Sequence, residues 1–138
     1  MVELSAEEAI SRIRADEARL GELQNQMQTI ARTIEELRMT RATLEQLPEE
    51  EATGLIPIGG VLIPIKVNAS KVKVNLGAGV IADKDRESAV EILKKREETM
   101  RQAMANMEQA FERTRNDALS LKRKLEERQK PNVPVISG

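Results

Sequence analysis

The sequence predicts a mainly α fold: a long antiparallel coiled-coil hairpin with two central β-hairpins that join an oligomeric β-barrel. Three observations predict it. Two segments, about 5–47 and 86–130, carry apolar residues in a seven-residue repeat and contain no proline. The segment between them, about 53–82, alternates in hydrophobicity and holds five of the seven glycines. We therefore expect residues 1–138 to form a single domain, with a flexible tail at 131–138.

The first helix is predicted from apolar residues that recur with the 3,4 spacing of a coiled-coil seam. Asp16 and Arg41 interrupt this seam, so it is not uniformly apolar. Pro48 disfavours helical geometry at Leu47 and so ends the helix. The seam consists of Ile13, Leu20, Leu23, Met27, Ile30, Ile34, Leu37 and Leu44.

The last segment repeats the pattern and predicts a second helix of similar length. Asp85 is a suitable N-cap for it. Glu97 is the polar exception at a seam position. The seam consists of Val90, Leu93, Met100, Met104, Met107, Phe111, Thr114, Ala118, Leu121 and Leu125.

The matched lengths of the two seams favour pairing within one chain. An antiparallel hairpin would bring Ile13 close to Leu121 and Leu125. It would also bring Leu44 close to Val90 and Leu93. The alternative is that each helix pairs with another chain. Pairing within the chain is the simpler arrangement, because the compact insert already joins the two helices.

The insert is predicted to form two β-hairpins, at about 53–67 and 71–82, because apolar and polar residues alternate there. Gly59-Gly60 suits a tight turn, and so does the 77–79 segment with its two glycines. Four such apolar strands cannot stand alone in water, so we expect equivalent hairpins from several chains to form one shared sheet or barrel. The expected assembly residues are Leu55, Ile56, Ile58, Val61, Ile63, Ile65, Val72, Val74, Leu76, Val80 and Ile81.

One stretch of the insert matches the glycine spacing of a dinucleotide-binding turn, Gly77-x-Gly79-x-x-Ala82. Such a site needs a helix that begins at the turn, so that its N-terminus meets the pyrophosphate. Val80 and Ile81 are β-branched and predict a strand instead. We interpret the glycines as a hairpin turn and expect no cofactor.

Composition excludes several other functions. The chain has no Cys and no His, and Phe111 is its single aromatic residue, so thiol and imidazole chemistry and base stacking lack their side chains. Its net charge of −1 argues against nucleic acid or an acidic membrane surface as the main partner. Glu49–Glu51 is interpreted as a solvated linker, and the Lys122–Lys124 cluster complements the end of a helix. We predict no enzyme, no metal site and a soluble cytoplasmic protein.

Antiparallel pairing would gather apolar residues at the helix ends that lie away from the insert. Pro131 and Pro134 stop the second helix, which should leave the last residues exposed. Two interpretations remain open: a frayed terminus, or an adaptable apolar patch that binds other proteins. The candidates are Val2, Leu4, Ile10, Ile13, Leu125, Val133, Val135 and Ile136.

The stretches 55–61 (LIPIGGV), 71–82 (KVKVNLGAGVIA) and 89–95 (AVEILKK) resemble the alpha-subunit family of archaeal prefoldin. The resemblance covers essentially the whole chain, and the insert is its most specific part. It implies two alpha and four beta subunits in a hexamer, with a β-barrel platform and six coiled-coil tentacles. It also implies an ATP-independent holdase whose tips capture non-native proteins and pass them to a group II chaperonin. The alternative is a structural coiled-coil adaptor that joins specific folded partners.

Overall fold

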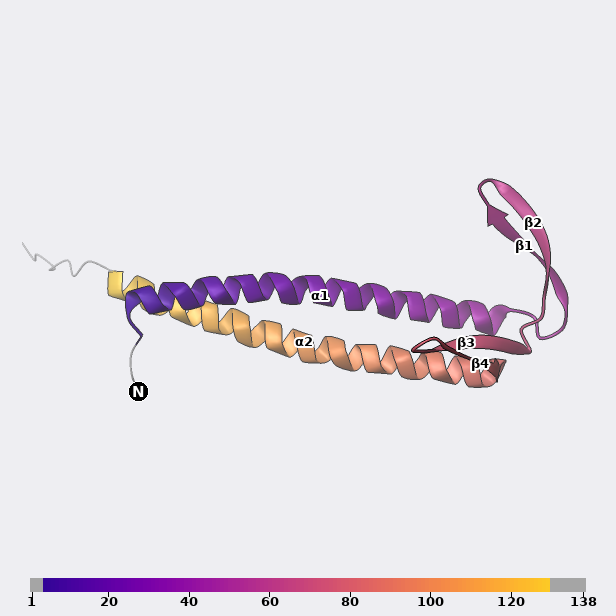
Figure 1. Cartoon of the computed structure of the whole chain (residues 1–138). Coiled ribbons are helices and arrows are strands. Elements are labelled where there is room, and N and C mark those ends of the chain that lie inside the picture. The colour runs from indigo at the N-terminus through magenta and orange to yellow at the C-terminus, as the bar shows by residue number, and fades with distance from the viewer. Residues whose placement is uncertain (1–3, 130–138) are drawn as a thin grey trace, which may run out of the picture. The chain divides into compact units, whose positions relative to one another are not determined.

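The computed structural model describes residues 4–129 and contains two long helices with two antiparallel β-hairpins between them (Figure 1). The predicted coiled-coil hairpin with two central β-hairpins is confirmed, and residues 4–129 of the single chain form no closed barrel. The elements in chain order are α1 (Ala6–Gln46), β1 (Ala52–Ile58), β2 (Val61–Val67), β3 (Lys71–Gly77), β4 (Val80–Asp85) and α2 (Arg86–Gln129).

The chain divides into two compact units, which are described separately. Of the described residues, the helix-end unit contains 4–30 and 103–129, and the hairpin unit contains 31–102. Each unit includes a part of α1 and a part of α2, and within each unit these parts lie side by side (Figure 1).

Both helices begin with side-chain caps. Ser5 and Glu8 form a reciprocal capping box, in which Ser5 Oγ accepts from the Glu8 N–H at 3.2 Å and Glu8 Oε2 accepts from the Ser5 N–H at 3.2 Å. At the start of α2, Asp85 Oδ1 accepts from the Ser88 N–H at 2.7 Å, which confirms the predicted N-cap. The bond from Ser88 lowers the pKa of Asp85 below its ordinary value, because it favours the ionised carboxylate.

The helix-end unit has a small apolar core. Ala9 and Ile13 of α1 pack with Leu121 of α2, and Leu4 and Leu125 cover this cluster. The predicted proximity of Ile13 to Leu121 and Leu125 is therefore confirmed, and the seam pairs within the chain. Burial of large aliphatic side chains contributes about 2 kcal/mol each and holds the two helix parts together.

In the hairpin unit, a charged pair replaces an apolar layer between the helices. Arg41 of α1 donates to Glu97 of α2 from Nε to Oε2 at 2.6 Å and from Nη2 to Oε1 at 3.3 Å. Glu97 is 5% exposed. These two residues are the polar exceptions that the sequence placed in the two seams, and they satisfy each other across the interface.

The first hairpin, β1–β2, closes with Gly59 and Gly60 at φ values of 55° and 83°. A two-residue loop with two positive φ angles is a type I′ turn, which matches the twist of the strands and favours glycine. At its base, the Ala69 N–H donates to the Pro48 carbonyl at 3.3 Å. The predicted turn and pairing of this hairpin are confirmed.

The second hairpin, β3–β4, turns at Ala78 and Gly79, both with positive φ, and carries a bulge between Asn75 and Gly77. Strand β4 follows this turn directly, so the glycines do not begin a helix and the dinucleotide-binding interpretation fails. The predicted end of this hairpin, at about residue 82, is three residues short of the observed end of β4 at Asp85.

Strand β4 continues to Asp85, because its last residues pair with charged residues of β3. Lys71 lies opposite Asp85, and Lys73 lies opposite Asp83 with a Nζ–Oδ1 distance of 2.9 Å. Opposite charges on facing positions stabilise an antiparallel pair. Charged residues in the Asp83–Asp85 stretch therefore continue the strand rather than forming a linker.

Candidate functional site

The residues from 4 to 129 offer binding surfaces rather than a reactive centre. No group of three or more acidic side chains within them is arranged to hold a metal ion, and the sequence contains no Cys or His. Neither α1 nor α2 has a stretch both long and apolar enough to cross a membrane. The candidate site is therefore sought among exposed apolar residues.

The predicted tip residues of the helix-end unit differ in accessibility. Ile10 is 37% exposed, whereas Ile13 is 8% exposed and belongs to the core. Leu4 and Leu125 are half-buried and border that core. The remaining predicted tip residues, Val2, Val133, Val135 and Ile136, lie outside the described residues. Ile10, Leu4 and Leu125 are thus the tip candidates that the structure leaves accessible.

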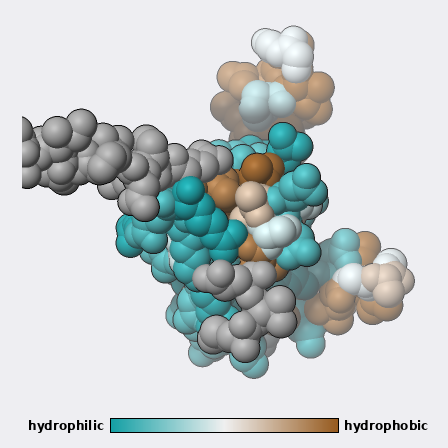
Figure 2. Space-filling view, turned by 90° about the vertical axis from the view of Figure 1, so that its left-hand side faces the viewer, coloured by the Kyte–Doolittle hydropathy of each residue, from teal (hydrophilic) through white to brown (hydrophobic). Residues whose placement is uncertain are grey.

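Apolar surface is visible at the helix ends. Figure 2 faces this end and shows a brown, hydrophobic strip between teal, hydrophilic flanks. Two ion pairs join the helices in this unit: Arg12 with Asp117, at 3.0 Å between Nε and Oδ2, and Lys122 with Glu17, at 2.8 Å between Nζ and Oε1. The visible apolar surface is therefore bordered by hydrophilic surface.

Two carboxyl groups meet beside the Arg12 pair. A hydrogen bond with Asp117 raises the pKa of Asp16, and burial adds to the rise. The same bond lowers the pKa of Asp117, with help from Arg12. Asp16, a predicted interruption of the seam, therefore holds its proton more tightly than an ordinary aspartate.

The first hairpin presents apolar residues on both faces. Leu62 is 59% exposed on one face, and Ile63 is 41% exposed on the other. Most of the visible surface of this hairpin is brown at the top of Figure 2. The other exposed large apolar residues of this hairpin are Leu55, Ile56, Ile58 and Val61.

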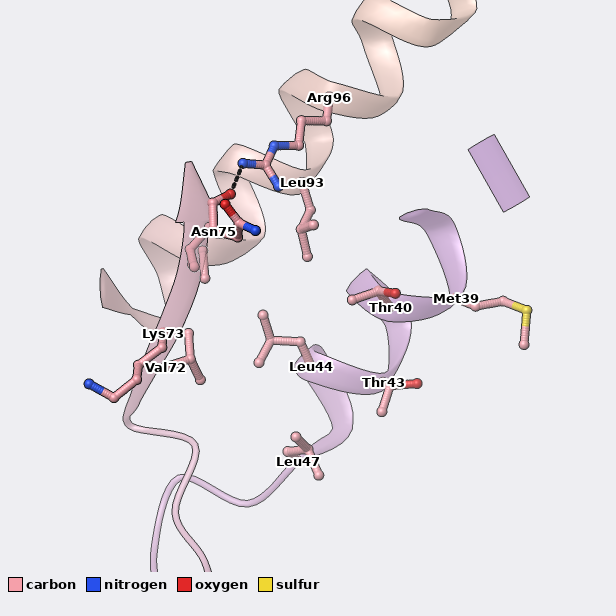
Figure 3. A pocket seen from close by; sticks show the side chains of 12 residues that line it. Met39, Thr40, Thr43, Leu44, Leu47, Val72, Lys73, Asn75, Leu93 and Arg96 are labelled. Atoms are coloured by element: carbon pink, nitrogen blue, oxygen red, sulfur yellow. Dashed lines mark hydrogen bonds between the residues drawn. The ribbon is translucent and has the colours of Figure 1, made fainter. Parts of the chain in front are cut away.

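The second hairpin has only one apolar face along its strands. Val72 and Val74 are half-buried and point towards the helices, while Lys71, Lys73 and Asp83 occupy the exposed face. Arg96 of α2 donates from Nη2 to the Asn75 carbonyl at 2.5 Å, which fixes β3 beside α2 (Figure 3). Near its turn, three large apolar residues of this hairpin remain exposed: Leu76, Val80 and Ile81.

Between α1, β3 and α2 lies an open groove of about 510 Å³ (Figure 3). Leu44, Leu47 and Leu93 form much of its apolar lining, and Met39 lies at one side with 56% exposure. No sequence pattern predicted this groove. Met39 could have indicated the groove, because it is a large apolar residue outside the seam. Arg96 could not, because its partner is a backbone carbonyl, which no sequence pattern reveals.

Comparison with known proteins decides the family. Residues 16–131 match the prefoldin subunit family. The chain belongs to the prefoldin family. Its structure is similar to that of filamentous prefoldin from Methanocaldococcus jannaschii, with a TM-score of 0.69 and 25% identity over 83% of this chain and 98% of the other. A search of curated proteins gives no significant match.

As a prefoldin, the chain is a chaperone-type subunit, and its exposed residues can be interpreted accordingly. The predicted assembly residues are the strand residues described above. Those of the first hairpin are mostly exposed, whereas Val72 and Val74 of the second already contact the groove.

Proposed function

We propose that this chain is an alpha-type prefoldin subunit that acts as an ATP-independent holdase. It captures unfolded proteins at the ends of its paired helices and transfers them to a group II chaperonin. The observation that carries this proposal is the accessible apolar surface at the helix ends, formed by Leu4, Ile10 and Leu125. The surface acts by binding, without catalysis or a bound cofactor.

The alpha assignment is supported by the two hairpins between the helices and by the sequence of the insert, which resembles that of archaeal alpha subunits. We accordingly propose beta-type prefoldin subunits as partners, in a hexamer of two alpha and four beta chains. The exposed apolar residues of the hairpins support this assembly, since their burial would stabilise the contact between subunits. A filament, the form of the similar M. jannaschii protein, is the competing assembly.

The mechanism is multivalent weak binding. Each pair of helix ends offers only a few apolar side chains, so the affinity of one end for an unfolded segment is low. Several ends attached to one platform raise the effective concentration of the second and later contacts. Release needs no nucleotide, because a chaperonin can compete for the same segments one contact at a time.

The test is suppression of aggregation. The chain is mixed with a beta-type subunit, and light scattering of unrelated chemically denatured proteins is followed without ATP. The assembled complex should suppress aggregation of several clients, and the isolated chain should do so poorly. Suppression of none of them would favour the structural coiled-coil adaptor, which binds specific folded partners.

Truncation separates capture from assembly. Removing residues 131–138 and replacing Val2 and Leu4 by Ser should weaken client binding while the oligomer survives. Size-exclusion chromatography with light scattering measures the oligomer, for this chain alone and with its beta-type partner. If the truncated chain no longer assembles, its ends belong to the platform and not to the client site.

A further inference from the structure

The groove between α1, β3 and α2 has apolar walls and one polar end. Leu44 and Leu47 of α1, Leu93 of α2 and Val72 of β3 form the walls. The side chains of Leu44, Leu93 and Val72 point into the same space (Figure 3). A volume of about 510 Å³ lies within the range of binding sites, so these walls can bury apolar side chains of another molecule.

The polar end consists of two side chains that the second hairpin holds in place. Arg96 donates from Nη2 to the Asn75 carbonyl at 2.5 Å, and the Gly77 N–H donates to Asn75 Oδ1 at 2.8 Å. Because Oδ1 accepts that bond, the orientation of the Asn75 amide is fixed. Its nitrogen then lies on the side of Leu93 and the groove (Figure 3).

This end of the groove offers hydrogen-bond donors without a negative charge. A guanidinium and an amide nitrogen can only donate. Within residues 4–129, Arg96 forms no ion pair, and the amide nitrogen of Asn75 donates to no group. The residues that line the groove include no aspartate or glutamate. A carboxylate is complementary to this end, because it only accepts and matches the fork of the guanidinium.

The openness of the groove favours a chain over a small molecule as its occupant. Small-molecule sites bury most of the ligand, whereas a groove open along one side suits a chain that continues beyond it. The first hairpin of a second copy is a poor occupant. Residues 52–65 contain no carboxylate, so that hairpin would cover the donors of Arg96 and Asn75 without satisfying them.

An extended, unfolded segment fits both parts of the groove. Alternate side chains of an extended chain lie on the same face. Two apolar residues and one acidic residue at alternate positions therefore face the groove together. The apolar side chains then lie against the leucines of the walls, and the carboxylate reaches the polar end.

We propose that this groove binds extended, unfolded segments in which an acidic residue follows alternating apolar residues. The apolar side chains pack between Leu44, Leu93 and Val72, and the carboxylate accepts from Arg96 and Asn75. The inference rests on the proposed function, which supplies the unfolded segments. It adds a preference for acidic, apolar segments to the apolar contacts at the helix ends.

The test measures peptide binding to the full-length chain. The chain contains no Trp, so the fluorescence anisotropy of a peptide with a single Trp reports binding. The probe is Trp-Leu-Ser-Leu-Ser-Glu, capped at both ends, and the control peptide ends in Gln. The Glu peptide should bind about tenfold more tightly, because a carboxylate accepts stronger hydrogen bonds from a guanidinium than an amide does. Equal affinities overturn the proposal, and so does binding that survives replacement of both leucines by Ser.

Two matched variants place the effect in the groove. Asn75→Asp keeps the oxygen that accepts from the Gly77 N–H, removes the amide donors and adds a carboxylate beside Arg96. It should lower the preference for the Glu peptide about tenfold. Asn68→Asp adds the same charge at an exposed position outside the groove lining and keeps the acceptor of the Ser70 N–H, so the preference should remain. A preference that survives Asn75→Asp, or that Asn68→Asp lowers equally, overturns the proposal.

Circular dichroism of each variant checks that the helices are intact. Suppression of aggregation by the complex with a beta-type subunit is measured separately. Loss of suppression with an intact preference for the Glu peptide rejects the proposed function alone. Intact suppression with equal peptide affinities rejects the groove as a site for acidic segments alone.

Discussion

Arg41 and Glu97 form a two-bond ion pair between α1 and α2, with Nε–Oε2 and Nη2–Oε1 distances of 2.6 and 3.3 Å. The Glu97 side chain is 7% exposed, and Arg41 also donates to Glu45. The pair fits in the seam only when these two positions face each other. It therefore favours one register of the antiparallel helices over neighbouring ones.

Removing one partner of this pair should destabilise the hairpin unit. Glu97→Ala leaves the guanidinium without its main acceptor and opens a gap between the helices, at a cost of about 2 kcal/mol in the free energy of unfolding. Urea denaturation followed by circular dichroism measures this cost. The double variant Arg41→Met/Glu97→Leu should recover most of the loss, because the layer becomes apolar. A double variant as unstable as Glu97→Ala would contradict the register argument.

Glu97 of the hairpin unit and Asp16 of the helix-end unit should contribute to the acid response with opposite signs. The hydrogen bond from Arg41 lowers the pKa of Glu97, so its contribution is present above the ordinary value of 4.5 and is lost as the pH falls through the lowered pKa. The bond with Asp117 raises the pKa of Asp16, so its contribution is present below 3.8 and is lost as the pH rises through the raised pKa.

Amide hydrogen exchange, resolved by peptide, measures the stability of each unit separately. The measurement is repeated at decreasing pH, from neutral into the acidic range. Arg12 and Asp117 act on Asp16, and Lys124 acts on Asp117. The matched variant is therefore Asp16→Asn, which keeps a hydrogen bond to Asp117 without a titrating proton. It should stabilise the helix-end unit at neutral pH by about 0.5 kcal/mol and remove the part of its acid response that Asp16 contributes. A response that persists in Asp16→Asn would assign the effect to another group.

Much of this fold could be predicted from the sequence, because its strongest signals are periodic and local. The seams predicted both ends of α1 to within one residue, and Asp85 marked the start of α2. The predicted end of α2, at about residue 130, lies outside the described residues. The predicted end of the second hairpin was wrong, because Asp83 and Asp85 lie opposite lysines only in the register that β3 and β4 adopt. The sequence alone does not reveal that register. The groove was not predicted, because Arg96 binds the backbone carbonyl of Asn75. Such a contact does not depend on the side chain at residue 75, so the sequence does not indicate it.

The prediction of the tip residues contains a conflict. Ile13 was assigned both to the seam and to the client-binding tip, and one side chain cannot fill both roles. The structure places it in the core, while Ile10, three residues earlier, remains accessible. Hydrophobicity alone does not distinguish them, because the distinction depends on how α1 is rotated towards α2.

Ile10 and Ile13 should therefore separate client binding from stability. Ile13→Ala leaves a cavity beside Ala9 and Leu121 and should lower the free energy of unfolding by about 3 kcal/mol. Ile10→Ser should change stability by less than about 0.5 kcal/mol and weaken capture of a denatured client several-fold. Thermal unfolding and aggregation suppression by the assembled complex provide the two measurements. If Ile10→Ser leaves capture intact, Ile10 is not part of the client site.

Charge on the Ile63 face of the first hairpin should block assembly without unfolding the chain. Ile63→Asp places a carboxylate on an exposed strand position, so the isolated chain keeps its helices, but burial of that carboxylate in a shared barrel costs several kcal/mol. Val74→Asp should also block assembly, with added loss of stability, because Val74 already lines the groove. Asn75→Asp is the control, because Asn75 is exposed and an aspartate keeps the side-chain oxygen that accepts from the Gly77 N–H. Light scattering after size-exclusion chromatography measures the mass with a beta-type partner, and a full-sized complex of Ile63→Asp would exclude the Ile63 face from the subunit interface.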